Sequence, residues 1–427
     1  MEQTLYDAYL RILEEELVPA MGCTEPISVA FAAALARQTL SAVPEKVDIR
    51  VSANIIKNVK SVVVPHTGGL RGIGAAAAAG IVAGDAHREL EVLAGVTPEQ
   101  IRQMALYLNT ASISISPSDS GYIFDIQIRV FAGSGSAFVQ IAGGHTNVIR
   151  IEKDGIPLLD KPYTEGGQVE KTDHELLTVE NIVAFADCVD IAAVRPVLDR
   201  QISCNMAIAE EGLSGDWGAN VGSVLLQAYG DTPFNRAKAL AAAASDARMS
   251  GCEKPVVINS GSGNQGLTAS LPVIAYAEAM NATNEQLYRA LVVSNLCTIH
   301  LKTGIGKLSA YCGATSAGCG AGAGIAYLLG GKVYEVAHTI VNAVAINSGM
   351  ICDGAKASCA AKISSAVEAG LLGMQMQLQG SQFYGGDGIL VKGVENTIRN
   401  VGRLARFGMA ETDKEIIQIM IADGPCP

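Results

Sequence analysis

The stretch YIFDIQIRVFA, residues 122–132, alternates apolar and polar side chains in the manner of a strand with one buried face. Two segments after it, SAFVQIAG (136–143) and NVIRIEKDGIPLL (147–159), continue the alternation. The KDG sequence at 153–155 lies inside the second segment and is typical of a tight hairpin turn. Together these segments predict a small antiparallel sheet.

Before this sheet, the sequence predicts three helices and one further strand. Helical spacing of apolar residues covers 4–20, an alanine-rich segment follows at 27–40, and small residues dominate 73–83. The segment VDIRVSANI (47–55) alternates as a strand does. After the sheet, the polar stretch 160–175 has the composition of a linker.

From about residue 176 the pattern changes to helical segments separated by Gly-, Ser- and Asn-rich turns. We therefore predict an α+β protein. Residues 1–170 would form an α/β-mixed N-terminal domain with the small sheet, and residues 171–427 an all-helical C-terminal domain. The abundant Ala and Gly would let helices pack closely, and such helices would suit the interface of a homodimer.

The composition argues against several classes of protein. Apolar residues make up 49% of the chain and charged residues 17%, which indicates a large buried core rather than disorder. The formal net charge is −11 without a basic block, so nucleic-acid binding is not expected. No signal peptide or long apolar run is evident, so we expect no membrane span and a cytoplasmic location. In that compartment, the ten cysteines would be free thiols or metal ligands.

Three cysteines lie on glycine-containing turns: Cys312 in SAYCGATSAGCG, and Cys352 and Cys359 in ICDGAKASC. On one straight helix, a spacing of seven residues would separate the last two by about 10.5 Å, too far for one small site. A break at Asp353-Gly354 would fold both sulfurs toward one point. Gathered thiolates suit an iron–sulfur cluster or zinc, and the absence of close CxxC pairs favours the cluster. The alternative is that each is a small core residue.

The other cysteines are expected to be core residues or bystanders. The core set comprises Cys188, Cys204, Cys252, Cys297 and Cys319. Cys426, in the tail DGPCP, could reach a metal, but a surface position is the simpler expectation.

The segments YCGATSAG and MICDGAKASC resemble the serine dehydratase α-chain family, and are closest to its branch of L-cysteine desulfidases. MGCTEPISVA, KNVKSVVVPHTGG, SGSGNQG and IHLKTGIGKLSAYCG extend the resemblance over nearly the whole chain. The resemblance implies β-elimination with a [4Fe-4S] cluster in a catalytic C-terminal domain. It implies that Cys312, Cys352 and Cys359 are the ligands and that one iron stays open for substrate. An open iron is a Lewis acid that could polarise a leaving group.

Cys23 is the predicted catalytic residue, because the corresponding cysteine of desulfidase relatives is thought to take part in catalysis. At the start of a helix, a cysteine gains thiolate character, so Cys23 could act as the base or as the acid at the leaving group. The alternative is a buried cysteine between two helices. Glu25 could be a capping residue of the first turn rather than a catalytic group.

The loop SGSGNQG precedes an expected helix, and its backbone N–H groups could hold a substrate carboxylate. Ser262, Asn264 and Gln265 in this loop are predicted to bind substrate, although a plain turn is the alternative. Other candidates lie in or near glycine-flanked turns: His66 and Thr67 in PHTGG, His145 in GGHTN, and Lys302 with Lys307 around TGIG. Lys302 could bind the substrate carboxylate, but surface lysines are the commoner outcome.

The leading hypothesis is therefore an iron–sulfur L-cysteine desulfidase that acts on this small amino acid to give sulfide, ammonia and pyruvate. L-serine dehydratase activity on the same scaffold is the nearest alternative. A non-catalytic iron–sulfur sensor is the second, although a redox protein would more often show four committed ligands. A metal-free helical scaffold is the third.

Overall fold

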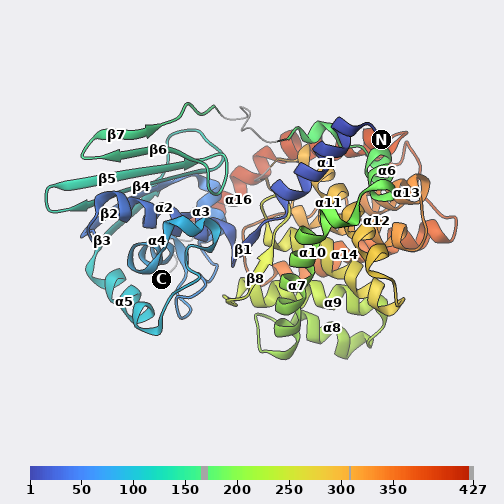
Figure 1. Cartoon of the computed structure of the whole chain (residues 1–427), viewed down its shortest axis with the longest axis horizontal. Helices are drawn as coiled ribbons and strands as arrows, with labels where there is room; N and C mark the ends of the chain where they lie inside the picture. Colours follow the sequence, from blue (N-terminus) through green and yellow to red (C-terminus); the bar gives the residue numbers. More distant parts are fainter. Residues whose placement is uncertain (165–171, 307–308, 423–427) are drawn as a thin grey trace.

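The computed structural model describes residues 1–164, 172–306 and 309–422. Two parts lie side by side, a sheet with helices packed on it and a larger helical body (Figure 1). The predicted α+β class is confirmed. No helix in the described ranges combines the length and the apolar character that crossing a bilayer requires.

The sheet has six strands in the order β3-β2-β4-β5-β6-β7. The strands are β2 (Lys46–Val51), β3 (Ser112–Pro117), β4 (Asp125–Ala132), β5 (Gly135–Ala142), β6 (Val148–Lys153) and β7 (Ile156–Asp160). Only the β2–β3 pair is parallel, and β3 was not predicted. Asp154 and Gly155 both have positive φ, the conformation that a two-residue hairpin turn requires, so the predicted turn is present.

The N-terminal helices are α1 (Gln3–Glu16), α2 (Thr24–Leu40), α3 (Ala53–Val59), α4 (Gly72–Ala83), the 3₁₀ helix η1 (Ala86–Glu91) and α5 (Pro98–Thr110). The predicted helix over 4–20 is too long, because Pro19 cannot continue it and instead begins β1 (Pro19–Met21). The predicted strand over 47–55 ends early for a similar reason. Ser52 hydrogen-bonds to the start of β4 and becomes the cap of α3.

The helical body contains α6 (Val179–Cys188), α7 (Ile191–Ser214), α8 (Val221–Tyr229), α9 (Pro233–Met249), α10 (Gly263–Ala279), α11 (Asn284–Thr303), α12 (Gly313–Leu328), α13 (Val333–Ile346), α14 (Cys359–Leu378), α15 (Val394–Arg403) and α16 (Ala410–Ala422). Two short helices, η2 (His174–Leu176) and the π-helical η3 (Leu404–Gly408), complete it. One strand, β8 (Pro255–Val257), departs from the all-helical prediction.

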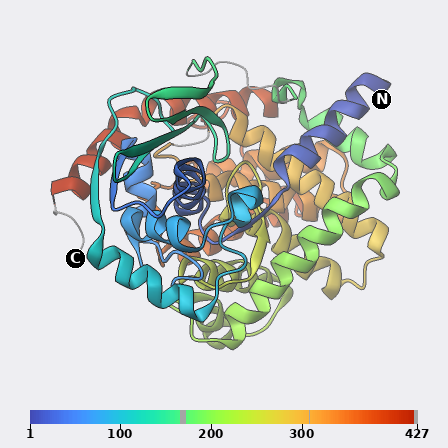
Figure 2. The ribbon, with the colours of Figure 1, turned by 60° about the vertical axis from the view of Figure 1, so that its left-hand side comes forward.

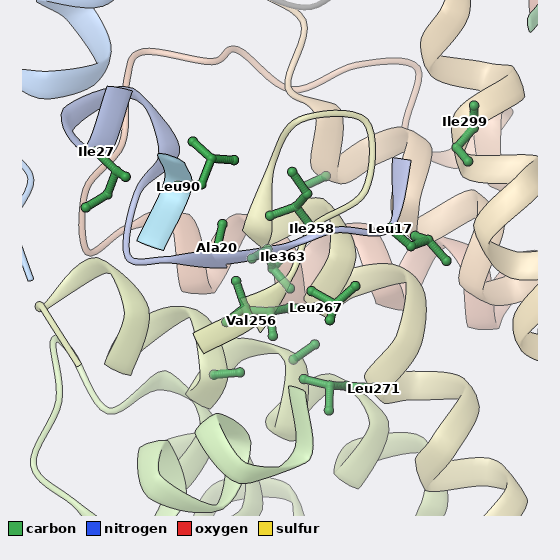
Figure 3. Packing of buried hydrophobic residues seen from close by; sticks show 14 of the residues in the cluster. Leu17, Ala20, Ile27, Leu90, Val256, Ile258, Leu267, Leu271, Ile299 and Ile363 are labelled. Carbon is green, nitrogen blue, oxygen red and sulfur yellow. The ribbon is translucent and has the colours of Figure 1, made fainter. Parts of the chain in front are cut away.

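Strand β8 pairs antiparallel with β1, so it joins the two parts of the molecule directly. The pair is buried: Ala20 and Val256 lie at its centre with Leu267 of α10 beside them (Figure 3). The chain leaves β1 into the Cys23 loop, and it leaves β8 into the loop that precedes α10. The β1–β8 pair therefore fixes two candidate site loops relative to each other.

Glycines set the spacing of α12 and α14 in the helical body. A Cβ on Gly370 would lie 2.0 Å from the carbonyl oxygen of Gly318, and a Cβ on Gly318 would lie 2.2 Å from the oxygen of Ala366. Since no side chain fits there, the two backbones touch. This is the close helix packing that the small-residue composition predicted. It holds together the two helices that begin at Cys312 and Cys359.

The last helix, α16, returns to the N-terminal part and packs against α3 (Figures 1 and 2). The ammonium of Lys57 in α3 forms an ion pair of 2.5 Å with Asp413, and Lys60 donates to the carbonyl oxygen of Met420. Two segments far apart in the sequence, α3 and α16, thus contribute to the contact between the two parts.

Candidate active site

Cys312 and Cys352 are held together by a short backbone pairing. An isolated β-bridge joins Tyr311 to Ile351, and the N–H of Cys312 donates to the carbonyl oxygen of Met350 at 2.8 Å. The interaction between the two thiols raises the pKa of Cys312 and lowers the pKa of Cys352 to about 6, with Lys57 among the further causes.

The Cys352–Cys359 segment breaks where the sequence predicts. Gly354 has a φ of 95°, and a Cβ there would lie 2.3 Å from the carbonyl oxygen of Lys57, so only glycine fits. Helix α14 starts at Cys359, whose thiol lies 3.8 Å from the oxygen of Gly354. The turn therefore directs both cysteines of this segment to the same cavity.

That cavity, the thiol cavity, has a volume of about 110 Å³. Its lining includes the three candidate ligands and the candidate catalytic residue, Cys312, Cys352, Cys359 and Cys23. It also includes four predicted substrate-binding residues, Ser262, Asn264, Gln265 and Lys302. Segments from across the sequence, including α2, α3, α9, α10, α11, α12 and α14, supply its walls.

His66 and Thr67 are not brought to this cavity. The Nδ1 atom of His66 lies 3.2 Å from Oε1 of Glu253, and the buried hydroxyl of Thr67 donates to the carbonyl oxygen of Val64 at 2.6 Å. These contacts stabilise the turn itself. We leave both residues out of the proposed site.

Cys23 caps the N-terminus of α2 and forms a pair with Glu25. Its Sγ lies 3.1 Å from Oε2 of Glu25, and Asn58 donates to Oε1 of the same carboxylate at 3.0 Å. Burial and the neighbouring Glu25 raise the pKa of Cys23 well above its ordinary value. The expected thiolate character from the helix N-terminus is therefore outweighed. Cys23 is a neutral thiol at neutral pH.

Glu25 is more than a first-turn capping group, because both of its carboxylate oxygens accept hydrogen bonds at the cavity wall. Burial alone would raise its pKa. The electrostatic interaction with His145, the hydrogen bond from Cys23 and other contacts lower the pKa by more, so the carboxylate is ionised. The pair therefore combines a proton donor with an acceptor 3.1 Å away.

Buried cations surround the thiols. Lys302 is 6% exposed, and burial lowers its pKa to about 8 against the opposing influence of Cys352 and Cys312. Lys57 is also buried and lines the same cavity. Such cations would stabilise thiolates or another negatively charged group in the cavity.

Arg248, at the end of α9, is a residue of this cavity that sequence reasoning missed. It is 2% exposed, and one Nη donates to Oδ1 of Asn264 at 3.1 Å. Its buried Nε has no hydrogen-bond partner, and among the described residues no carboxylate lies within 4.0 Å of the guanidinium. The only sequence signal is a charged residue closing an alanine-rich helix.

A larger cleft of about 750 Å³ adjoins the thiol cavity. The two share Glu25, Ser262 and Lys302 as lining residues. His145, which was considered from sequence without a firm role, lines the larger cleft and lies within 5.0 Å of the ring of Phe124, measured between centroids. The cleft is a route by which a small molecule can reach the thiols.

Most of the remaining cysteines lie where they were expected. Cys252, Cys297 and Cys319 are buried, and Cys204 is partly buried. Cys188 is exposed, so its assignment to the core was wrong; it ends α6, where the helix leaves the core. Cys426 and Lys307 lie outside the described residues.

The three cysteine thiols suit an iron–sulfur cluster better than a single metal ion. Across the described ranges, no group of three or more His, Cys, Asp or Glu residues is arranged to hold one metal ion. In a four-iron cluster each thiolate binds a different iron, so three ligands need not converge on one point. Three free thiols around one cavity, with buried cations beside them, match that requirement.

Comparison with known proteins supplies the family. A family model described as "Serine dehydratase alpha chain" matches residues 87–418. The chain belongs to the serine dehydratase α-chain family. This confirms the resemblance seen in sequence, and the matched range includes the loop before α10, Arg248 and all three candidate ligands.

Curated relatives of this serine dehydratase α-chain family member extend over the whole chain. The chain is 58% identical over 416 residues to a UPF0597 protein of Desulfitobacterium hafniense, covering 97% of both chains. It is 48% identical to a UPF0597 protein of Lachnoclostridium phytofermentans, covering 98% of this chain and all of the relative. A UPF0597 protein of Bacteroides thetaiotaomicron is 39% identical, over 97% of both chains. The family supports a lyase-type role in amino-acid degradation.

Proposed function

We propose that the protein is an iron–sulfur-dependent lyase that eliminates sulfide from L-cysteine and gives pyruvate and ammonia. In this proposal residues 171–427 form the cluster-binding domain, and residues 1–170 contribute the Cys23 loop. One observation carries the proposal: the three cysteines and the Cys23–Glu25 pair line one cavity. The volume of that cavity, about 110 Å³, suits a small substrate.

Cys312, Cys352 and Cys359 would hold a [4Fe-4S] cluster. When bound, the cluster supplies an open iron whose Lewis acidity favours departure of a soft sulfur anion. The buried ammonium groups of Lys57 and Lys302 favour the thiolate form of Cys352.

The Cys23–Glu25 pair would handle the substrate α-proton. The ionised Glu25 takes the proton from the α-carbon, the neutral thiol of Cys23 protonates the departing HS⁻, and Glu25 then returns its proton to Cys23. The C–H electron pair forms the Cα=Cβ bond, the Cβ–S bond breaks, and sulfur leaves as HS⁻. The aminoacrylate product then tautomerises and hydrolyses to pyruvate and ammonia.

L-serine is the second candidate substrate, because the matched family model is that of a serine dehydratase chain. The same atoms would serve, with hydroxide leaving in place of HS⁻. A sensor role would not need the Cys23–Glu25 pair or the adjoining cleft of about 750 Å³. We also retain the homodimer as a prediction.

The decisive experiment compares both substrates on anaerobically purified protein. We expect sulfide and pyruvate in equal amounts from L-cysteine, with a kcat/KM at least tenfold above that for L-serine. A reversed preference would make the protein a serine dehydratase. If neither substrate turns over on protein that contains iron and labile sulfide, the lyase proposal is wrong.

A further inference from the structure

Two buried groups in the thiol cavity lack the partners that burial normally requires. The first is Nε of Arg248, and the second is Oε1 of Gln265, a residue that is 5% exposed. Unsatisfied buried groups of this kind are costly, unless a ligand completes them. One group is a cationic donor and the other an acceptor, and both line the same cavity as Cys23.

The guanidinium of Arg248 is held in one orientation. Asn264 accepts a hydrogen bond from one of its Nη atoms at 3.1 Å, and Ser245 donates to the same Oδ1 at 3.3 Å. Nε and the other Nη form no hydrogen bond to any described residue. Those two atoms form the edge of the guanidinium that binds a carboxylate through two parallel N–H···O bonds.

The start of α10 adds to this arrangement. A Cβ on Gly263 would lie 2.3 Å from Nε of Arg248, so the guanidinium lies directly against the first residue of the helix. The positive end of the helix and the guanidinium together favour an anion at this place. Asn264, which sequence analysis assigned to substrate binding, lines the cavity and also orients Arg248.

The side chain of Gln265 packs against the turn that carries Cys312. A Cβ on Gly313 would lie 2.5 Å from its amide carbon, so the amide packs on the residue that follows Cys312. No described residue donates a hydrogen bond to the carbonyl oxygen of this amide. An ammonium group of a ligand would supply one.

We propose that Arg248 binds the α-carboxylate of the substrate and that Oε1 of Gln265 accepts a hydrogen bond from its α-ammonium group. The site would thus select zwitterionic α-amino acids. This inference rests on the proposed function, since it names how the substrate of that lyase is held. With both groups bound, the α-carbon would lie in the cavity that the Cys23–Glu25 pair and the three cysteines also line.

The test measures binding of a non-reacting amino acid by titration calorimetry on the full chain, anaerobically and again after removal of iron. L-alanine has both charged groups, L-alaninamide lacks the carboxylate, and propionate lacks the ammonium. We expect wild-type protein to bind L-alanine at least tenfold more tightly than either analogue. Arg248→Gln should lose roughly 10- to 100-fold of the L-alanine affinity, and Arg248→Lys less, because lysine keeps the charge but not the fork.

Two further variants test Gln265 separately and control for nonspecific effects of substitution. Gln265→Leu should weaken L-alanine binding but leave propionate binding unchanged, and Arg102→Gln on exposed α5 should change neither. Wild-type protein that does not prefer L-alanine, or Arg248→Gln protein that folds and binds it normally, would overturn the inference. Binding of L-alanine without turnover of either L-cysteine or L-serine would instead refute the lyase proposal alone.

Discussion

The thiol of Cys23 lies 3.1 Å from the carboxylate of Glu25 and is protonated, while that carboxylate is ionised. A buried thiol beside an anion stays protonated and is a poor nucleophile, while an ionised carboxylate can accept a proton. The pair therefore suits proton transfer at carbon. It also explains why the residue two positions after Cys23 is an acid.

Replacing Cys23 with Ser should lower kcat on L-cysteine about 100-fold or more, because a serine hydroxyl is a far weaker acid than the thiol. Glu25→Gln should lower it similarly, since the amide cannot accept the proton. Steady-state sulfide release measures both effects, and iron content should match wild type. Cys188→Ser, at an exposed position, should retain full activity. Normal kcat in the Cys23→Ser protein would exclude Cys23 from the chemistry.

Changing Cys312, Cys352 or Cys359 singly to Ala should remove most of the iron and labile sulfide from anaerobic protein. Each change deletes one of three proposed ligands, and two thiolates hold a cluster much less firmly. Metal analysis and visible absorbance are the measurements. The matched control is Cys319→Ala, which removes a buried thiol in α12 outside the cavity lining. Full iron content in all three ligand variants would rule out the assigned ligands.

The contact between Glu395 and His300 should make stability depend on acid pH. The two side chains lie 2.7 Å apart, and Glu395 also accepts from the N–H of Val179. Burial opposes ionisation of Glu395, but these hydrogen bonds lower its pKa overall below the ordinary 4.5. The stabilisation is therefore complete above about pH 4.5 and is lost as pH falls through the lower folded-state pKa.

Glu395→Gln should accordingly cost about 1 kcal/mol of unfolding free energy at pH 7, given the partial exposure of the carboxylate. The difference from wild type should shrink below pH 4. Urea denaturation at several pH values measures it. A constant difference across that range would show that ionisation of Glu395 does not contribute.

Gly370→Ala should destabilise the protein by about 1–3 kcal/mol, because the added methyl group would meet the backbone of Gly318 and push α12 from α14. The midpoint of urea denaturation should fall. Ser365→Ala, on the exposed side of α14, should leave the midpoint unchanged or slightly higher. Equal stability of the Gly370→Ala protein and wild type would mean that the helices adjust at no cost.

Sequence patterns predicted the elements whose signals are local. The alternation in 122–132 and the turn at 153–155 found the sheet, and Gly354 marked the break before Cys359. Strand β3 was overlooked although SISISP alternates Ser and Ile as a strand does; the segment is short and lies mostly exposed at the edge of the sheet. The β1–β8 pair was missed because two three-residue segments, 236 positions apart at Pro19 and Pro255, show no pattern until they meet.

In the candidate site too, only residues with a local sequence signal could be predicted. The cysteines are conspicuous in sequence because they sit on glycine turns. Arg248 is not conspicuous, because its role depends on which groups surround it after folding. What distinguishes it is the lack of an acidic partner among the described residues, which only the assembled cavity reveals. The prediction that a helix terminus would lower the pKa of Cys23 failed for the same reason, since burial is a property of the whole fold.

The ion pair between Lys57 and Asp413 ties one wall of the thiol cavity to the final helix of the chain. Lys57 and Asp413 are 356 positions apart in the sequence, so the ammonium of Lys57 gains this counter-charge only when α16 docks against α3. Undocking of α16 would leave an unneutralised positive charge beside the thiols. The charge balance of the thiol cavity is thus linked to the docking of a helix outside its lining.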